Sequence, residues 1–269
     1  MRSLLSRRQP SLSDRTDQAA GLRRLFSGGA HQRFVPVAAN PHVGGVELLL
    51  ERLTAALAAQ GGNTLIIDAA ESAPEAAPAV LEDPALGIEP LGNGLSYLAA
   101  RGLPARLLAA QGSAAQWLQH LARSAPQCDV LMVHAGAAEL SRFFEGRAVN
   151  PLLLAGEDAD SLAHALASLR LLGSRHRCTR FDLLLGAPMS SPQAARAVRH
   201  LAGWARNRPG AALREGVAVD PARGGAAATV PASLARLAAA LLETEERQAD
   251  QGWHPGGDAA LDSTPSARN

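Results

Sequence analysis

Short apolar runs alternate with longer amphipathic stretches along most of this chain, and this alternation restricts the fold more than any other feature. Residues 34–39, 47–60 and 63–68 have the patterns of a strand, a helix and a strand. Further strands are expected around Ile88 and at 129–134, 150–156, 181–188 and 215–220, with helices at 95–124, 158–172, 191–207 and 231–247. The pattern predicts an α/β fold, a doubly wound and mostly parallel sheet with helices on both faces.

The composition predicts an aliphatic core and a surface whose cations are all arginine. Hydrophobic residues make up 47% of the 269 residues and aromatic residues only 3%, which suits helices packed on a parallel sheet. All 26 basic residues are Arg, so chemistry that needs a lysine, including a phosphate-loop lysine, is excluded. A net charge of +1 without a dense basic run argues against a nucleic-acid partner.

The two cysteines and the lack of a long apolar stretch indicate a cytoplasmic protein. Cys128 and Cys178 have neither the spacing of a zinc site nor that of a disulfide framework, so buried free thiols are expected. No run of about 18 uncharged apolar residues occurs, and the first residues are too weakly apolar for a secretory signal. We expect no metal.

The chain is expected to consist of a flexible leader (1–30), an α/β domain (31–248) and a disordered tail (249–269). Within the leader, residues 17–26 (DQAAGLRRLF) can form a short amphipathic helix, with Thr16 or Asp17 as its cap. A helix of this length is not stable alone, so it would order on a partner. The alternative is a terminal helix that packs on the domain.

The loop after the first expected strand, residues 38–47 (AANPHVGGVE), lies where a doubly wound sheet binds its ligand. It resembles the deviant phosphate loop of MinD/ParA ATPases, usually KGGVGKT. On that alignment Val43 and Gly44 match, whereas the signature lysine becomes Asn40, two glycines become Pro41 and His42, the phosphate lysine becomes Gly45, and the magnesium-binding hydroxyl becomes Val46. Pro41 removes an N–H donor, His42 obstructs close approach, and Gly45 supplies no cation.

Other positions that the resemblance marks are also altered. Asp68 matches the first acid of an Asp-x-Asp strand end, but the second acid is Ala70. His134 replaces a metal-side Asp, and Gly186 or Ala187 stands where the family has an Asn that contacts adenine. A lone histidine can bind a metal, but we expect a structural or solvated role for His134 and a cap or turn role for Asp68.

Residues 17–23 (DQAAGLR) resemble the DQAxxLR segment that FlhG proteins carry ahead of their ATPase domain. In that family the segment binds the SRP-type GTPase FlhF and stimulates GTP hydrolysis. The resemblance implies that Gln18 acts near the attacking water and that Asp17 and Arg23 fix the helix on the partner. Leu22, Leu25 and Phe26 would form its apolar anchor.

The sequence therefore suggests a FlhG-like regulator of flagellar number or placement, a pseudo-ATPase that activates FlhF. One alternative is a MinD-like ATPase in which Asp68 and the N–H groups of residues 42–46 still hold Mg-ATP, the only cofactor considered. Another is a structural partner of flagellar or MinD-like proteins, such as a switch component or regulator. ATP dimerises active relatives, so we expect a monomer or a nucleotide-independent homodimer. The apolar stretch 233–248 is expected to cover the core, with membrane contact a minor alternative and any recruitment to the cell pole indirect.

Overall fold

The computed structural model describes residues 32–110, 113–175, 178–188, 190–206, 212–222 and 230–243. The DQAAGLRRLF segment at 17–26 and the expected tail at 249–269 lie outside these residues. The expectations for both therefore stay predictions.

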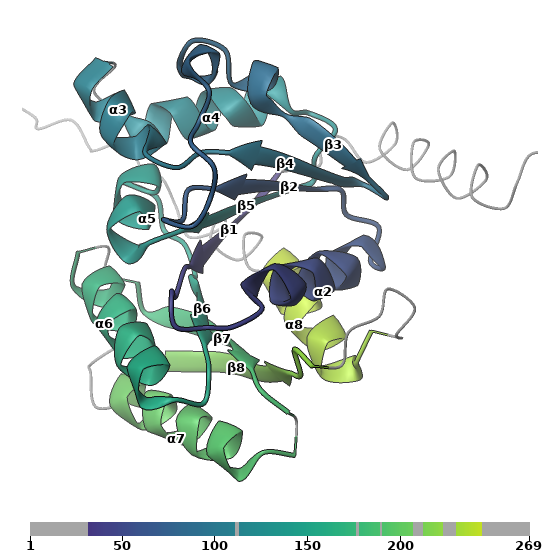
Figure 1. Cartoon of the computed structure of the whole chain (residues 1–269), viewed down its shortest axis with the longest axis vertical. Helices are drawn as coiled ribbons and strands as arrows, with labels where there is room; N and C mark the ends of the chain where they lie inside the picture. The colour runs from purple at the N-terminus through teal and green to yellow at the C-terminus, as the bar shows by residue number, and fades with distance from the viewer. Residues whose placement is uncertain are drawn as a thin grey trace, which may run out of the picture.

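The centre of the molecule is an eight-stranded sheet in the order β3-β4-β2-β5-β1-β6-β7-β8 (Figure 1). Its strands are β1 Arg33–Ala38, β2 Thr64–Asp68, β3 Glu89–Gly92, β4 Leu95–Ala99, β5 Val130–Ala135, β6 Leu152–Ala155, β7 Arg180–Gly186 and β8 Ala212–Val219. Every neighbouring pair is parallel except β3 with β4. The prediction of a mostly parallel sheet is confirmed.

Helices cover both faces of this sheet, as predicted (Figure 1). One face carries α2 Val46–Ala58 and α8 Ala232–Glu243. The other carries α3 Leu103–Ala110, α4 Ala114–Ser124, α5 Ala137–Phe143, α6 Ala159–Arg175 and α7 Pro192–Arg206. Two short 3-10 helices, η1 Pro78–Leu81 and η2 Pro84–Gly87, lie between β2 and β3.

The central strands are apolar on both sides because helices cover both sides. In β5, Val130 and Met132 pack in the core beneath α2 and α8, whereas Leu131 and Val133 pack in the opposite core. All six residues of β5 are buried. A continuous apolar run is therefore the correct sequence signal for this strand, and alternation would have been the wrong one.

The helix expected over residues 95–124 is wrong in its first part. Leu95–Ala99 is the strand β4, which pairs in parallel with β2, and the helical part is divided into α3 and α4. The β1–β2–β5 core offers an open edge to which β4 adds, and burial of Leu98 there outweighs the helical pattern. Ser113 caps α4 by accepting a hydrogen bond from the Gln116 N–H, which separates it from α3.

Two smaller features also differ from expectation. The strand expected around Ile88 begins at Glu89, and this β3 is an exposed antiparallel edge, whereas Ile88 itself ends η2. The short helix α5, residues Ala137–Phe143, was not expected. It covers the sheet through Leu140 and Phe143 and carries Glu139 in its first turn.

The chain enters the sheet at the amino end of β1, where Gln32 is held by its side chain. Its amide Nε2 donates to the carbonyl oxygens of Ala125 (2.8 Å) and Cys128 (3.1 Å), between α4 and β5. The chain therefore enters the sheet at the amino ends of the parallel strands, on the side opposite to their carboxyl ends.

Both cysteines are buried free thiols, as predicted. Burial raises the pKa of the Cys178 thiol to about 11, so it is a poor nucleophile at neutral pH. Within the part of the chain that the structure describes, no helix is both long and apolar enough to cross a membrane.

Candidate functional site

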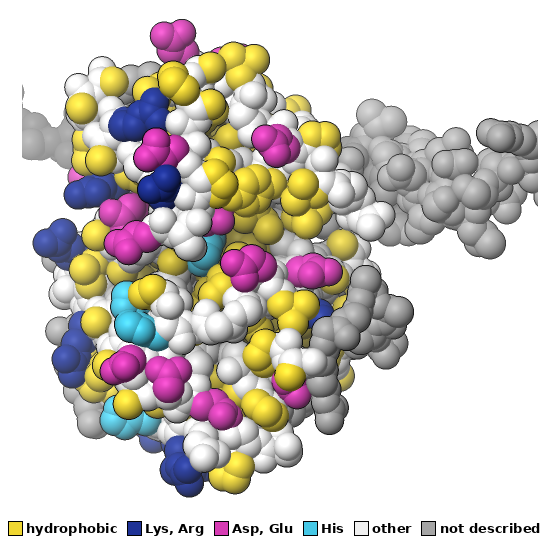
Figure 2. All heavy atoms as spheres, viewed as in Figure 1, with side chains coloured by type: hydrophobic (Ala, Val, Ile, Leu, Met, Phe, Trp, Pro, Cys, Tyr) yellow, Lys and Arg dark blue, Asp and Glu magenta, His cyan; other side chains and the backbone are white. Residues whose placement is uncertain are grey.

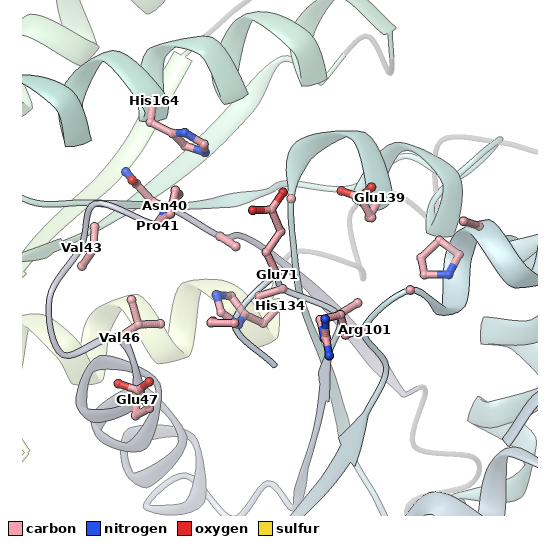
Figure 3. A pocket seen from close by; sticks show the side chains of 18 of the residues that line it. Asn40, Pro41, Val43, Val46, Glu47, Glu71, Arg101, His134, Glu139 and His164 are labelled. Carbon is pink, nitrogen blue, oxygen red and sulfur yellow. The ribbon is translucent and has the colours of Figure 1, made fainter. Parts of the chain in front are cut away.

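A pocket of about 550 Å³ lies at the carboxyl ends of β1, β2, β4 and β5 (Figure 3). Its walls come from the β1–α2 loop, the segment after β2, the start of α3, the β5–α5 turn and His164 of α6. Parallel strands bring all these segments to one edge, and the chain changes direction across the sheet between β5 and β1. This is the place where doubly wound sheets bind ligands.

Asn40 fixes the loop on one side of the pocket. Its buried Nδ2 donates to the carbonyl oxygens of Leu154 (2.9 Å) and Ser161 (2.9 Å), and its Oδ1 accepts the His42 N–H (3.1 Å). The side chain thus joins the β1–α2 loop to β6 and α6. The position that the alignment gives to the signature lysine serves a structural purpose here.

Two N–H groups that a phosphate cradle would supply are turned inward in this loop. The N–H of His42 donates to Asn40 Oδ1, and the N–H of Val43 donates to the Asn40 carbonyl oxygen, each at 3.1 Å. An N–H group so engaged must break its bond before it can donate to phosphate. Asn40 therefore occupies both N–H groups, one with its side chain and one with its carbonyl oxygen.

The turn from loop to helix occurs at Gly45, which has a left-handed backbone (φ 69°) and caps α2. Val46 is the first helical residue and Glu47 the second. If the final glycine of the family loop is aligned with Gly45, Val46 takes the lysine position and Glu47 the hydroxyl position. In both alignments no cation stands at the start of α2.

The Val43 side chain points inward and packs beside Gly186, one of the two positions at which the resemblance places a contact to adenine. Its side chain is buried, and a Cβ added to Gly186 would lie 3.4 Å from Val43 Cγ1 and 3.3 Å from Leu49 Cδ1. A larger residue at Gly186 would displace this packing. Ala187 is also buried, and neither glycine nor alanine offers a polar side chain to a base.

Asp68 and His134 form a hydrogen-bonded pair beside the pocket. They lie opposite each other in the parallel register of β2 and β5, and His134 Nδ1 is 2.9 Å from Asp68 Oδ1. Asp68 also accepts the Ala70 N–H (3.3 Å) and the Tyr97 hydroxyl (3.3 Å). Burial and the Asp68 carboxylate raise the pKa of Tyr97 to about 12.

The other ring nitrogen of His134 has no partner among the described residues. The side chain is only 5% exposed and lines the pocket, yet Nε2 makes no hydrogen bond. The role of Nε2 depends on the protonation of the ring: opposite a carboxylate that accepts from Nδ1–H, Nε2 accepts in the neutral ring and donates in the protonated one. The described residues hold no group of three side chains arranged to bind a metal ion.

Acidic side chains and histidines surround this region. Glu47, Glu71 and Glu139 line the pocket with one arginine, Arg101, which forms an ion pair with Glu75 at 3.4 Å. Figure 2 shows acidic and histidine side chains across the middle of the visible face, between α2 and α6. Glu139 lies over the Gly136 backbone, where an added Cβ would be 2.6 Å from its Oε2. Glu139 is itself paired with Arg142 at 3.5 Å, and the buried Nε of Arg101 has no partner among the described residues, so the lining presents both charges.

Comparison with known proteins gives similarity in structure alone. No protein-family model and no curated protein matches this sequence. Cobyrinic acid a,c-diamide synthase from Mycobacterium smegmatis, solved with ADP and magnesium, has a TM-score of 0.60 and 14% identity over 81% of this chain and 97% of that chain. A ParA family ATPase from Chlorobium tepidum TLS gives 0.53 and 10%, over 78% and 99%. MinD from Aquifex aeolicus gives 0.52 and 14%, over 83% and 99%.

This chain has the MinD/ParA-type fold. Within that fold the structure brings together many of the residues singled out from the sequence: Asn40, Pro41, Val43, Gly45, Val46 and His134 all line the pocket. Asp68 lies just behind them, bonded to His134. His42 and Gly44 are exposed on the same loop, and the His42 ring lies 5.8 Å from that of His164.

Sequence reasoning missed the acidic side of the site and the tyrosine. Glu71 follows β2 by three residues, which is a position where the sequence offered a signal, because it stands next to the altered Asp-x-Asp end. Glu139, Arg101, Tyr97 and His164 come from segments that reach the pocket only through the sheet topology. No local sequence pattern marks these residues as part of a site.

Proposed function

We propose that this chain is a FlhG-like regulator of flagellar number or placement, a pseudo-ATPase that binds and stimulates an SRP-type GTPase of the FlhF kind through residues 17–26. The observation that carries the proposal is a DQAAGLR motif ahead of a loop whose N–H donors are taken by Asn40. The motif is complete, whereas the loop behind it has no lysine. On this proposal the chain affects the hydrolysis of GTP bound to its partner and hydrolyses no nucleotide of its own.

The loop geometry supports the pseudo-ATPase part. ATP-Mg requires donors and cations around its phosphates, and each charge-assisted hydrogen bond contributes about 1.5–3 kcal/mol. Here the N–H groups of His42 and Val43 are engaged, Val46 offers no hydroxyl, and Glu47 and Glu71 bring negative charge. Losing several such contacts weakens binding by orders of magnitude.

The place where the chain enters the fold supports action on a separate protein. Gln32 is fixed at the amino end of β1, opposite the pocket, and the five residues 27–31 can span at most about 17 Å. A glutamine amide such as Gln18 can accept from an attacking water and donate to a phosphate oxygen without changing charge.

GTP turnover by purified FlhF in the presence of the full chain tests the proposal. The wild-type chain is expected to raise the turnover rate, and Gln18→Ala to remove most of the increase while the chain still folds. Gln119→Ala, on the exposed side of α4, is the matched control and is expected to stimulate normally. Equal stimulation by wild type and Gln18→Ala would overturn the assignment.

A MinD-like ATPase with a reworked loop is the second candidate, favoured by the structural similarity to a synthase solved with ADP and magnesium. In this case the N–H groups at the start of α2 would donate hydrogen bonds to the phosphates. Calorimetry with Mg-ATP separates the two candidates. Binding tighter than about 100 μM favours the ATPase, and no binding at that concentration favours the pseudo-ATPase.

A further inference from the structure

We propose that residues 17–26 dock on their own chain, with their apolar side on a surface formed by Leu95 and Tyr97 of β4 and bordered by Leu91 of β3, here called the β3–β4 surface. A docked segment is withheld from other proteins. That docking thereby competes with an FlhF-type GTPase rests on the proposed function, whereas the docking itself does not.

The β3–β4 surface belongs to the sheet face that carries α2 and α8. Among the described residues, α2 packs against β2 and β7 and α8 against β8, which leaves this end of the face without a helix of its own. Leu95 and Tyr97 lie beside Ile66 of β2 and are only partly buried, and Leu91 is 59% exposed. Figure 2 shows hydrophobic side chains gathered above α2, over these strands. Covering them with another apolar group is favourable.

The segment is tethered within reach of this surface. One row of paired residues runs across the sheet from β1 through β5 and β2 to β4: Arg33, Val130, Thr64 and Leu95. Neighbouring strands lie about 4.8 Å apart, so Leu95 is about 14 Å from Arg33. Residues 27–31 span at most about 17 Å, which is enough to bring the segment to the amino end of β4.

The segment also has a matching apolar side. In a helix over residues 17–26, Leu22 and Phe26 stand one turn apart with Leu25 beside them. A helix of this length needs a surface to become stable, and the β3–β4 surface supplies one. At the other end of the chain, residues 244–269 offer one tryptophan and one leucine as large apolar residues, eight positions apart, so they have no comparable side.

Charge selects between the same two ends of the chain. Glu89 of β3 is exposed, and so is Glu51, which follows Glu47 by one turn of α2. Figure 2 shows acidic side chains above and below the hydrophobic patch. Residues 1–31 contain six arginines and two acids, whereas residues 244–269 contain five acids and two arginines. The surface therefore attracts the basic end and repels the acidic one.

Cross-linking of the full chain with a short bismaleimide tests the docking. Ala19→Cys is combined with Leu91→Cys, and the matched control combines it with Leu108→Cys, a partly exposed leucine of α3 on the opposite face. The native cysteines are buried. Docking raises the effective concentration of the first pair of thiols, so this pair is expected to react within one chain about tenfold faster than the control. Mass spectrometry of the monomer band identifies the linked peptides.

A third substitution shows whether the apolar side holds the segment. Leu22→Ser, added to the first pair, is expected to lower the rate to that of the control pair, because it removes the central apolar residue. Leu12→Ser, a leucine ahead of the segment, is the matched change and should leave the rate unchanged. Equal rates for the two triple variants would overturn the proposal.

Two further results would also overturn the docking. The first is that the Leu91→Cys pair reacts no faster than the Leu108→Cys pair. The second is that its product runs only as a dimer, which would show that a second copy of the chain covers the surface. Addition of FlhF is expected to slow the cross-link, and an unchanged rate would overturn the competition while the docking stands.

Discussion

Tyr97 is the only tyrosine of the chain, and its hydroxyl donates to Asp68 Oδ2. Burial first, and then the Asp68 charge, raise its pKa to about 12. The unfolded chain ionises near pH 10, so the stabilising contribution of the neutral phenol is complete below pH 10 and is lost between pH 10 and about 12. We expect the tyrosinate absorbance of the folded protein to titrate about two pH units later than that of the protein in denaturant.

Asp68→Asn is the control for this titration. It removes the carboxylate and leaves the burial, so the midpoint should fall but stay above that of the unfolded chain. Tryptophan fluorescence reports whether the protein is still folded at each pH. A midpoint near 10 while the fluorescence is native would show that the environment of Tyr97 is not the one described.

Asn40 is the residue on which the shape of the loop depends. Asn40→Ala leaves the carbonyl oxygens of Leu154 and Ser161 and the N–H of His42 without their partner. Each of these three hydrogen bonds contributes about 0.5–1.5 kcal/mol net, so we expect a loss of roughly 2–4 kcal/mol in the free energy of unfolding. Urea unfolding measures it, and the exposed Pro41→Ala, expected within about 0.5 kcal/mol of wild type, is the control.

At the scale of the elements, the start of α2 depends on one backbone conformation. Gly45 is left-handed, and a Cβ there would also lie 3.3 Å from Pro221 Cβ. Gly45→Ala should therefore lower the free energy of unfolding by about 1–2 kcal/mol. Gly44 has no positive φ and no atom within 4 Å of an added Cβ, so Gly44→Ala should change little. Equal urea-unfolding midpoints for Gly45→Ala and Gly44→Ala would contradict the left-handed conformation assigned to Gly45.

The elements also show what the sequence could and could not predict. The unit β1-α2-β2 was predictable because two apolar runs flank a long amphipathic stretch. β4 was not, because Leu95–Ala99 is followed within four residues by the apolar helix α3, and periodicity cannot separate the two. What makes β4 a strand is its pairing with β2, a contact about thirty residues away in sequence.

The same limit applies to the site. Its location followed from the loop after the first strand, and Asn40, Asp68 and His134 were singled out for their positions at strand ends. Their actual interactions were not predictable. The Asp68–His134 bond needs the register that sets these two residues opposite each other, and the Tyr97–Asp68 bond needs the parallel pairing of β4 with β2.

At the scale of the whole molecule, we expect that Mg-ATP does not change the state of assembly. The His42 and Val43 N–H groups of the loop donate to Asn40, and on the proposed function nucleotide does not bind there and supplies no energy to a dimer interface. Sedimentation velocity with and without Mg-ATP should give the same coefficient, whether the protein is a monomer or a dimer. A MinD protein with an intact KGGVGKT loop is the positive control, and an ATP-dependent increase for this chain would contradict the expectation.

The two ends of β1 are fixed by separate sets of contacts. At the amino end, the Gln32 amide donates to the carbonyl oxygens of Ala125 and Cys128 in the α4–β5 turn. Beyond the carboxyl end, the Asn40 amide donates to the carbonyl oxygens of Leu154 and Ser161 and shapes the pocket loop. The two sets share no residue, so a strand of six residues separates the point where the chain enters the sheet from the loop that lines the pocket.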